Sequence, residues 1–165
     1  MIAIRIQKQK DFMGKLLTSE IFDTFLVNEA TIETFNTFHI DGKLHKDFYN
    51  SVDSSDYIPD SDFSLWKNLR PICLDLIKGK RTPLGFRFIF YLGGSLREAL
   101  INASGSDILP EQVNLGLNIK YSSGEMILTT GTAFSIFTLD KEIEKAWDSY
   151  IPSFLDKNNI EYELL

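Results

Sequence analysis

The alternation of apolar and polar residues along this chain predicts most of its strands. Isoleucines at every second position of 2–6 indicate a first strand, and a longer alternating stretch runs over 26–40. Since strands seldom reach that length, we expect a break or bulge near Phe35. The strongest pattern is at 84–92, where phenylalanines and leucines occupy every second position. A period of two is typical of half-buried strands.

The sequence Asp-Gly at 41–42 indicates a hairpin after this long stretch. A three-residue loop over 40–42 gives the glycine the left-handed position and keeps the apolar side chains on one face. In that register His39 and His45 lie on the outer face, diagonal to each other and within reach of a shared metal ion. No metal-binding spacing supports such a site, so we expect two solvent-exposed histidines and assign no metal.

Two more strands are expected at 113–119 and 125–137, with a three-residue loop at 122–124 between them and a bulge at Gly131. The last residues, 160–164, alternate again and predict a closing edge strand. By contrast, residues 50–62 are polar, rich in Asp and interrupted by a proline, which indicates a loop. They lack the residue order of a calcium-binding loop.

Apolar residues at helical spacing predict amphipathic helices between these strands. Asn68 is expected to cap the second helix and Gly79 to end it, whereas Pro152 is expected to interrupt the last one near residue 153. A Ser-x-x-Glu capping box predicts a further short helix. The expected ranges are 10–18, 68–78, 95–102 and 138–151.

Together these elements predict an α+β fold: a mostly antiparallel sheet with two helices on one face and a C-terminal amphipathic helix. The length of 165 residues fits a single domain over 1–165. The single cysteine, Cys73, lies in the apolar stripe of the second helix, so we expect a packed thiol in a reducing compartment. No apolar run is long enough for a membrane span or a signal peptide. We therefore expect a cytoplasmic protein.

The sequence carries no common motif for catalysis or cofactor binding. The chain has no Gly-x-Ser-x-Gly, His-Glu-x-x-His, Cys-x-x-Cys or Gly-x-Gly-x-x-Gly. Gly-Lys-Arg-Thr at 79–82 looks like the end of a phosphate loop but lacks the upstream glycine, and Gly-Gly at 93–94 is expected to be a turn. We assign no catalytic residue and no cofactor. An enzyme stays open, because active sites also assemble from distant residues.

The charge of the chain is unevenly distributed. The formal net charge is −6, yet residues 1–97 sum to +1 and residues 98–165 to −7. Basic residues gather on or beside the first two helices, where they form either ordinary solvated helix faces or, if the helices lie side by side, a patch that contacts phosphates. The candidate contacts are Lys8, Lys10, Lys15, Arg70, Lys78, Lys80 and Arg81.

Three segments carry a family resemblance: FNTFHIDGKLHKDFY (35–49), LRPICLDLIKGKRTPLGFRFIF (69–90) and FTLDKEIEKAWD (137–148). The chain resembles an uncharacterised domain-of-unknown-function family from clostridia-type gut bacteria over nearly its full length. This resemblance implies a bacterial, intracellular setting and transfers no functional residue.

The order of elements through residue 92 also resembles one domain of a DNA sliding clamp. Those domains pair a basic helical face with sheets on the outside, in chains that are acidic overall. The resemblance implies an alternative, DNA-clamp-like fold in which this chain oligomerises to make a ring. It rests on topology and carries no sequence motif.

Three functional hypotheses follow from these patterns. The first is a non-enzymatic intracellular binding or interaction protein, with a protein partner or self-association and no membrane. The second is a nucleic-acid-associated accessory factor that uses a basic two-helix face. The third is an enzyme of unassigned class, which requires a pocket where His39, His45 or buried carboxylates converge.

Overall fold

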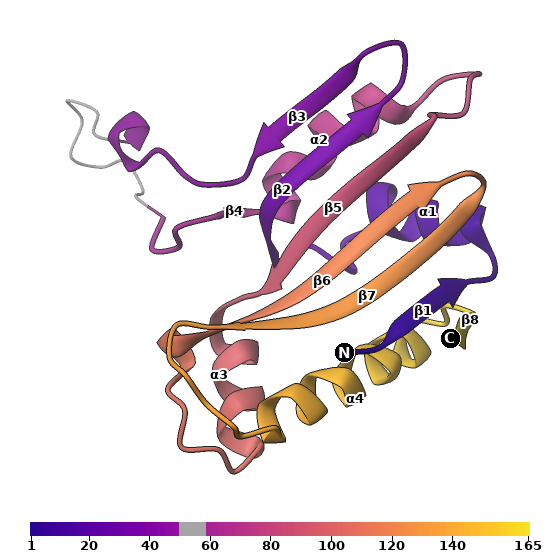
Figure 1. The fold of residues 1–165 in the computed structure, drawn as a ribbon. Coiled ribbons are helices and arrows are strands. Elements are labelled where there is room, and N and C mark those ends of the chain that lie inside the picture. Colours follow the sequence, from indigo (N-terminus) through magenta and orange to yellow (C-terminus); the bar gives the residue numbers. More distant parts are fainter. Residues whose placement is uncertain (50–58) are drawn as a thin grey trace.

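The computed structural model, which describes residues 1–49 and 59–165, contains one eight-stranded antiparallel sheet (Figure 1). The strands are β1 (Ala3–Ile6), β2 (Phe25–Glu33), β3 (Thr37–Asp41), β4 (Ser64–Leu65), β5 (Gly85–Leu92), β6 (Val113–Ser122), β7 (Glu125–Phe134) and β8 (Tyr162–Leu164). They are ordered β3-β2-β5-β6-β7-β1-β8, with β4 paired to β2 next to β3. The expected α+β fold is thus confirmed, including the closing edge strand β8.

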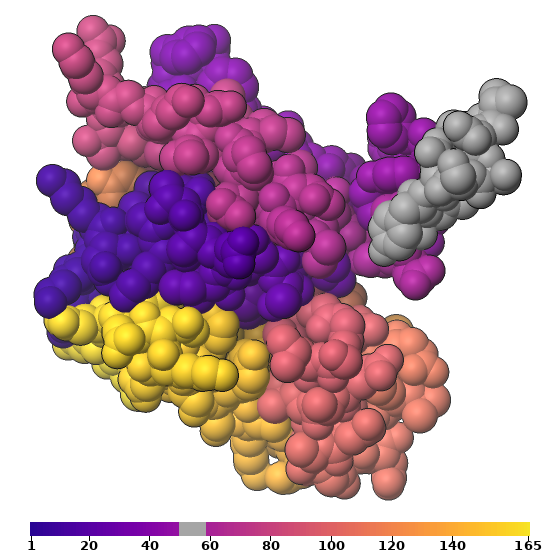
Figure 2. Space-filling view, turned by 180° about the vertical axis from the view of Figure 1, so that it is seen from behind, coloured from indigo at the N-terminus to yellow at the C-terminus, as the bar shows by residue number. Residues whose placement is uncertain are grey.

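The helices cover one face of this sheet, as Figure 2 shows from the helical side. They are α1 (Gln9–Thr18), α2 (Trp66–Ile77), α3 (Gly94–Ala103) and α4 (Glu142–Lys157), with short 3-10 turns at Lys46–Tyr49 and Pro110–Gln112. From top to bottom of that view α2, α1 and α4 follow one another, and α3 lies beside α4. In Figure 1 the opposite sheet face points toward the viewer, and no described helix covers it. No helix in the described ranges combines the length and apolarity that crossing a bilayer requires.

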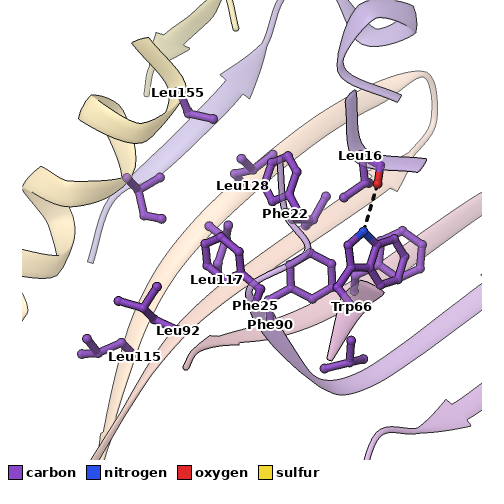
Figure 3. Close-up of a cluster of buried hydrophobic side chains, with 14 of the residues drawn as sticks. Leu16, Phe22, Phe25, Trp66, Phe90, Leu92, Leu115, Leu117, Leu128 and Leu155 are labelled. Carbon is purple, nitrogen blue, oxygen red and sulfur yellow. Dashed lines mark hydrogen bonds between the residues drawn. The ribbon is translucent and has the colours of Figure 1, made fainter. Parts of the chain in front are cut away.

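An aromatic core fills the space between the sheet and the helices (Figure 3). The inward side chains of β5, which include Phe88 and Phe90, are fully buried. The ring of Trp66 lies 5.1 Å and 5.0 Å from their centroids, and its Nε1–H donates to the Leu16 carbonyl at 2.9 Å. Trp147 of α4 likewise donates to the Gly116 carbonyl of β6. Each indole thus fixes its helix to a backbone group while burying a large apolar ring.

The hairpin expected at Asp41-Gly42 is wrong, because the chain turns earlier, at 34–36, between β2 and β3. Thr31 stands opposite His39, so the register that placed His39 diagonal to His45 is also wrong. The glycine has a different role: the N–H of Gly42 donates to the Asn28 carbonyl at 2.9 Å, beside a β-bulge in β2. A Cβ atom built on Gly42 would lie 1.8 Å from the Val27 carbonyl oxygen.

Replacing Gly42 by alanine is therefore expected to destabilise the fold by at least ~2 kcal/mol, because the clash is with backbone that cannot rotate away. Gly131→Ala is the matched control, since the space where its Cβ would lie is empty within 4 Å. Urea denaturation followed by circular dichroism measures both variants. Equal stabilities for the two would contradict the close contact at Gly42.

The β6–β7 hairpin is tighter than expected. Ser122 pairs with Glu125, which leaves a two-residue loop whose residues, Ser123 and Gly124, have positive φ angles of 53° and 78°. That backbone is typical of a type I′ turn, whose twist matches the twist of the strands. The expected bulge at Gly131 is absent, because Gly131 pairs directly with Gly116 in an unbroken register.

Helix boundaries differ from expectation where capping residues were used to set them. α2 begins at Trp66, ahead of Asn68, and α3 begins at Gly94, ahead of the Ser-x-x-Glu box. Pro152 does not end α4, which continues to Lys157 because Ile151 and Leu155 are buried in the core on either side of it. Packing of an apolar face here outweighs the backbone hydrogen bond that proline removes. Most of the loop expected at 50–62 lies outside the described residues.

The expectation of a packed Cys73 is confirmed, since its side chain is fully buried on the core side of α2. Burial raises the pKa of this thiol to about 12, so almost no thiolate forms near neutral pH. We expect native protein to resist a disulfide-exchange thiol reagent for hours, and denatured protein to react within minutes. The absorbance of the released reagent measures the rate of labelling. Rapid labelling of the native protein would show that α2 readily moves away from the core and exposes Cys73.

Candidate nucleic-acid interface

α1 and its flanking residues form the first half of the candidate surface. Phe12, Leu16 and Leu17 recur at helical spacing and are buried against the sheet. Lys8 and Lys10, at the start of the helix, point away from this stripe and are exposed. The helix therefore presents its basic N-terminal turn to solvent because its apolar residues fix the opposite side.

α2 and the segment that follows it form the second half. The buried side of α2 contains Trp66, Cys73 and Ile77. After the helix ends, Lys78, Gly79, Lys80 and Arg81 are all exposed before the chain enters β5. Three cations therefore lie close together in sequence at the C-terminal end of α2, where the helix dipole favours positive charge.

The two helices lie side by side (Figure 2), and the ribbon shows that they run in opposite directions (Figure 1). Trp66, the first residue of α2, donates to Leu16 near the end of α1, and Arg70 reaches Asp23 beyond α1. At about 1.5 Å per residue these helices span roughly 15 and 18 Å. The start of α1 and the end of α2 consequently lie at the same end of the molecule. This arrangement brings Lys8 and Lys10 toward the basic segment after α2.

This two-helix face, residues 7–24 and 66–82, has a charge opposite to that of the whole chain. It contains eight Lys and Arg residues and four Asp and Glu residues, a net charge of +4. The rest of the chain is correspondingly more acidic, since the total is −6. A polyanion near the protein is therefore drawn to this face and repelled by the remainder.

Five of the seven candidate cations are exposed and available to a ligand. Lys8 pairs with Glu161 at 2.6 Å, and this hydrogen bond raises the lysine pKa. Lys78 pairs with Asp75 at 2.8 Å, also at the surface. Exposed pairs of this kind contribute little and exchange readily for another anion. Among the described residues, the remaining three make no ion pair: Lys10, Lys80 and Arg81.

The other two candidates are engaged within the protein. Arg70 forms a bidentate pair with Asp23, with distances of 2.8 and 2.9 Å from Nε and Nη2 to the two carboxylate oxygens. The two side chains are only 19% and 10% exposed, and the hydrogen bonds raise the pKa of Arg70. Lys15 Nζ binds Asp11 and the Asn159 carbonyl. The structure thus separates these two residues from the five available cations.

Arg70→Ala is expected to lower the free energy of unfolding by about 2 kcal/mol, because it leaves the half-buried Asp23 carboxylate without its partner. Lys78→Ala is the control, since its exposed pair should contribute less than ~0.5 kcal/mol. Urea denaturation of both variants measures the difference. A loss for Arg70→Ala no larger than for Lys78→Ala would show that the Asp23 pair is not structural.

A groove of about 950 Å³ at the other end of α2 was not foreseen from the sequence. The N-termini of α2 and α3 border it, and Gly93-Gly94 was its one sequence signal. Its charged lining residues are Glu20, Asp23, Asp60, Asp62, Lys67, Arg97 and Glu98. Neither histidine lines it. Of the carboxylates that the enzyme hypothesis allowed instead, Asp23 is the one largely buried, and it is paired with Arg70. In the described ranges, His, Cys, Asp and Glu side chains form no metal-binding group of three or more.

Comparison with known proteins gives a family but no characterised relative. No curated protein and no solved structure matches the chain. Residues 15–163, which include α2 and the last turn of α1, match the family of unknown function DUF5721. The chain therefore belongs to the DUF5721 family.

Proposed function

We propose that this protein is a non-enzymatic binding protein that associates with nucleic acid through its two-helix face. The observation that carries the proposal is the antiparallel packing of α1 against α2, which gathers exposed cations on one face. In this reading Lys8, Lys10, Lys78, Lys80 and Arg81 contact phosphates, while Arg70 and Lys15 hold the helices in place.

The chemistry of this face suits the sugar-phosphate backbone better than the bases. Its cations are flexible side chains on a convex helical surface, and they recognise a line of negative charge without reading base edges. Binding of this kind releases condensed counterions and weakens steeply with salt. We therefore expect similar affinity for unrelated sequences.

We further propose that the protein acts in a bacterial cytoplasm and that it resembles a domain of a DNA sliding clamp. A bacterial cytoplasm supplies both nucleic acid and the reducing conditions that suit a lone cysteine. A helical layer with net positive charge, backed by a sheet, is the feature that a clamp-like protein would turn toward DNA. The helices α3 and α4, which share that layer, are additions to such a domain.

The test is an anisotropy titration of labelled mixed-sequence duplex and single strands at several salt concentrations. With five phosphate contacts, log K against log salt should have a slope of roughly −4 to −5 for duplex. A second duplex of unrelated sequence should bind within about threefold of the first. Absence of binding at ~20 mM salt, where electrostatic attraction is strongest, would rule the proposal out.

A further inference from the structure

An exposed aromatic ring lies at the tip of the β2–β3 hairpin, beside the basic segment that follows α2. Phe35 is 86% exposed, and Leu84, just before β5, is 74% exposed. We propose that Phe35 stacks on an unpaired base, so that the ligand of the two-helix face is a single strand of nucleic acid. Since the cations of that face must hold the strand against the ring, the stacking role rests on the proposed function.

The hairpin itself does not require an aromatic residue at this position. The turn at 34–36 is closed by the Thr34 N–H, which donates to the Asn36 carbonyl at 2.9 Å. Turns usually contain Gly, Asn, Asp, Pro or Ser, whose backbone or side chain suits the reversal. The Phe35 ring also contributes little to the core, because most of its surface is in water. The ring is therefore available to a ligand, and covering it would stabilise the complex.

The contact with Phe38 fixes the side of the sheet on which the Phe35 ring is held. Phe38 pairs with the buried Ile32 and packs against the core, so its side chain points to the helical side. The two phenyl rings meet edge to face, with centroids 5.6 Å apart and planes at 80°. Such a contact uses at most one face of either ring, which leaves at least one face of Phe35 free. Phe35 thus presents a free ring face from a neighbour that lies on the same side of the sheet as α1 and α2.

Backbone contacts bring the hairpin tip close to the basic segment after α2. The Leu84 N–H donates to the Glu33 carbonyl at 2.8 Å, and Gly85 pairs with Glu33 in the sheet. Arg81, three residues before Leu84, lies within roughly 11 Å of it, because extended chain spans at most about 3.6 Å per residue. Phe35, two residues after Glu33, lies within roughly 7 Å of it for the same reason. Both views show the two segments next to each other at one end of the molecule (Figure 1, Figure 2), so a few nucleotides of one strand can contact both.

The charges around the tip suit a strand of phosphates on the helical side. The segment 78–81 contains three exposed cations, and the nearby Asp75 carboxylate is paired with one of them, Lys78. Glu33 is exposed at the tip, but its neighbour Ile32 in β2 points into the core. Because successive side chains of a strand point to opposite faces, the Glu33 carboxylate points away from the helical side. A phosphate that approaches the cations therefore does not meet it.

An exposed ring next to cations favours a single strand over a duplex. In a duplex the bases are stacked and paired, and a protein reaches only the phosphates, the sugars and the base edges in the grooves. An unpaired base has a free π-face, which stacks on an aromatic ring whatever its sequence. Phe35 therefore adds affinity for single strands that the cations alone do not provide.

Phe35→Ala tests this role in an anisotropy titration of a labelled mixed-sequence single-stranded DNA. Loss of one stacked base should weaken binding roughly 5- to 100-fold, and the slope of log K against log salt should not change because no phosphate contact is lost. Duplex affinity should stay within about twofold of the wild type, since paired bases do not reach the ring. The matched control is Phe137→Ala, whose ring is 90% exposed but lies between β7 and α4, and it should change neither affinity. Unchanged single-strand affinity for Phe35→Ala, or an equal loss for Phe137→Ala, would overturn the proposal.

A Phe35→Trp variant supplies a second measurement, in which the stacked ring is itself the reporter. Trp66 and Trp147 are fully buried, so the new indole is the one that a strand reaches. Its fluorescence should be quenched when single-stranded DNA binds. An abasic strand of the same length, which has phosphates but no bases, should bind without this quenching. Equal quenching by both strands, or no quenching by a strand that binds, would overturn the stacking role.

The outcomes separate this role from the proposed function. If the wild-type protein binds neither single strand nor duplex at low salt, both fail together. If Lys78→Glu, Lys80→Glu and Arg81→Glu together abolish binding while Phe35→Ala has no effect, the cationic face stands and the stacking role of Phe35 alone is overturned.

Discussion

Replacing Trp66 by alanine is expected to lower the free energy of unfolding by about 3–5 kcal/mol, a large share of the stability of a protein this size. The indole is fully buried and packs on Phe88 and Phe90 of β5. Its removal leaves a cavity between α2 and the sheet. It also removes the donor to the Leu16 carbonyl, which then lacks one of its hydrogen bonds.

Trp66→Phe separates these two contributions. The phenyl ring keeps most of the aromatic packing and loses only the indole N–H, so a loss of about 1–2 kcal/mol is expected. Urea denaturation of the wild type and both variants, analysed as two-state transitions with equal m values, provides the comparison. A loss below ~1 kcal/mol for Trp66→Ala would mean that Trp66 does not fix α2 to α1 and the sheet.

Reversing three cations after α2 is expected to abolish nucleic-acid binding while the fold is kept. Lys78→Glu, Lys80→Glu and Arg81→Glu together change the net charge from −6 to −12 and turn the end of the two-helix face acidic. All three residues are exposed, so thermal unfolding should stay close to that of the wild type. At low salt the affinity should fall at least a hundredfold, since three phosphate contacts become three repulsions.

A second triple variant controls for net charge alone. Lys141→Glu, Lys145→Glu and Lys157→Glu reverse three cations on and beside α4, which also brings the net charge to −12. Because these residues lie outside the two-helix face, we expect an affinity within about fivefold of the wild type. Equal losses in the two triple variants would mean that binding follows the total charge rather than this face.

The spacing of apolar residues predicts the strands and helices that bury one side. It does not predict features that depend on contacts between segments far apart in the sequence. The strand β5 and the helix α1 were read correctly because one face of each is apolar throughout. The length of the alternating stretch predicted a break near Phe35, where the chain turns between β2 and β3. Because residues 34–36 contain neither glycine nor proline, the sequence did not indicate that the chain reverses there. The sequence Asp-Gly predicts a turn at Gly42, whereas the structure requires glycine there because the backbone passes close to the Val27 carbonyl.

The candidate interface could likewise be predicted only in part from the sequence. The sequence located the basic residues, but whether α1 and α2 are neighbours depends on contacts such as Trp66 to Leu16, fifty residues apart. It also grouped Arg70 with the surface cations, since its bidentate partner Asp23 lies in a different element. Ion pairs between residues far apart in the sequence decide which cations remain available to a ligand. The composition of the chain does not reveal these pairs.

Backbone amide NMR of the ¹⁵N-labelled protein, titrated with a short mixed-sequence DNA duplex at low salt, tests the central claim most directly. A chain of 18.9 kDa is suitable for this measurement. The two-helix face predicts chemical-shift changes concentrated at 7–24 and 66–82, strongest around Lys8, Lys10 and the segment 78–81. Changes centred on the sheet around Asn118 of β6, or on α3 and α4, would contradict it.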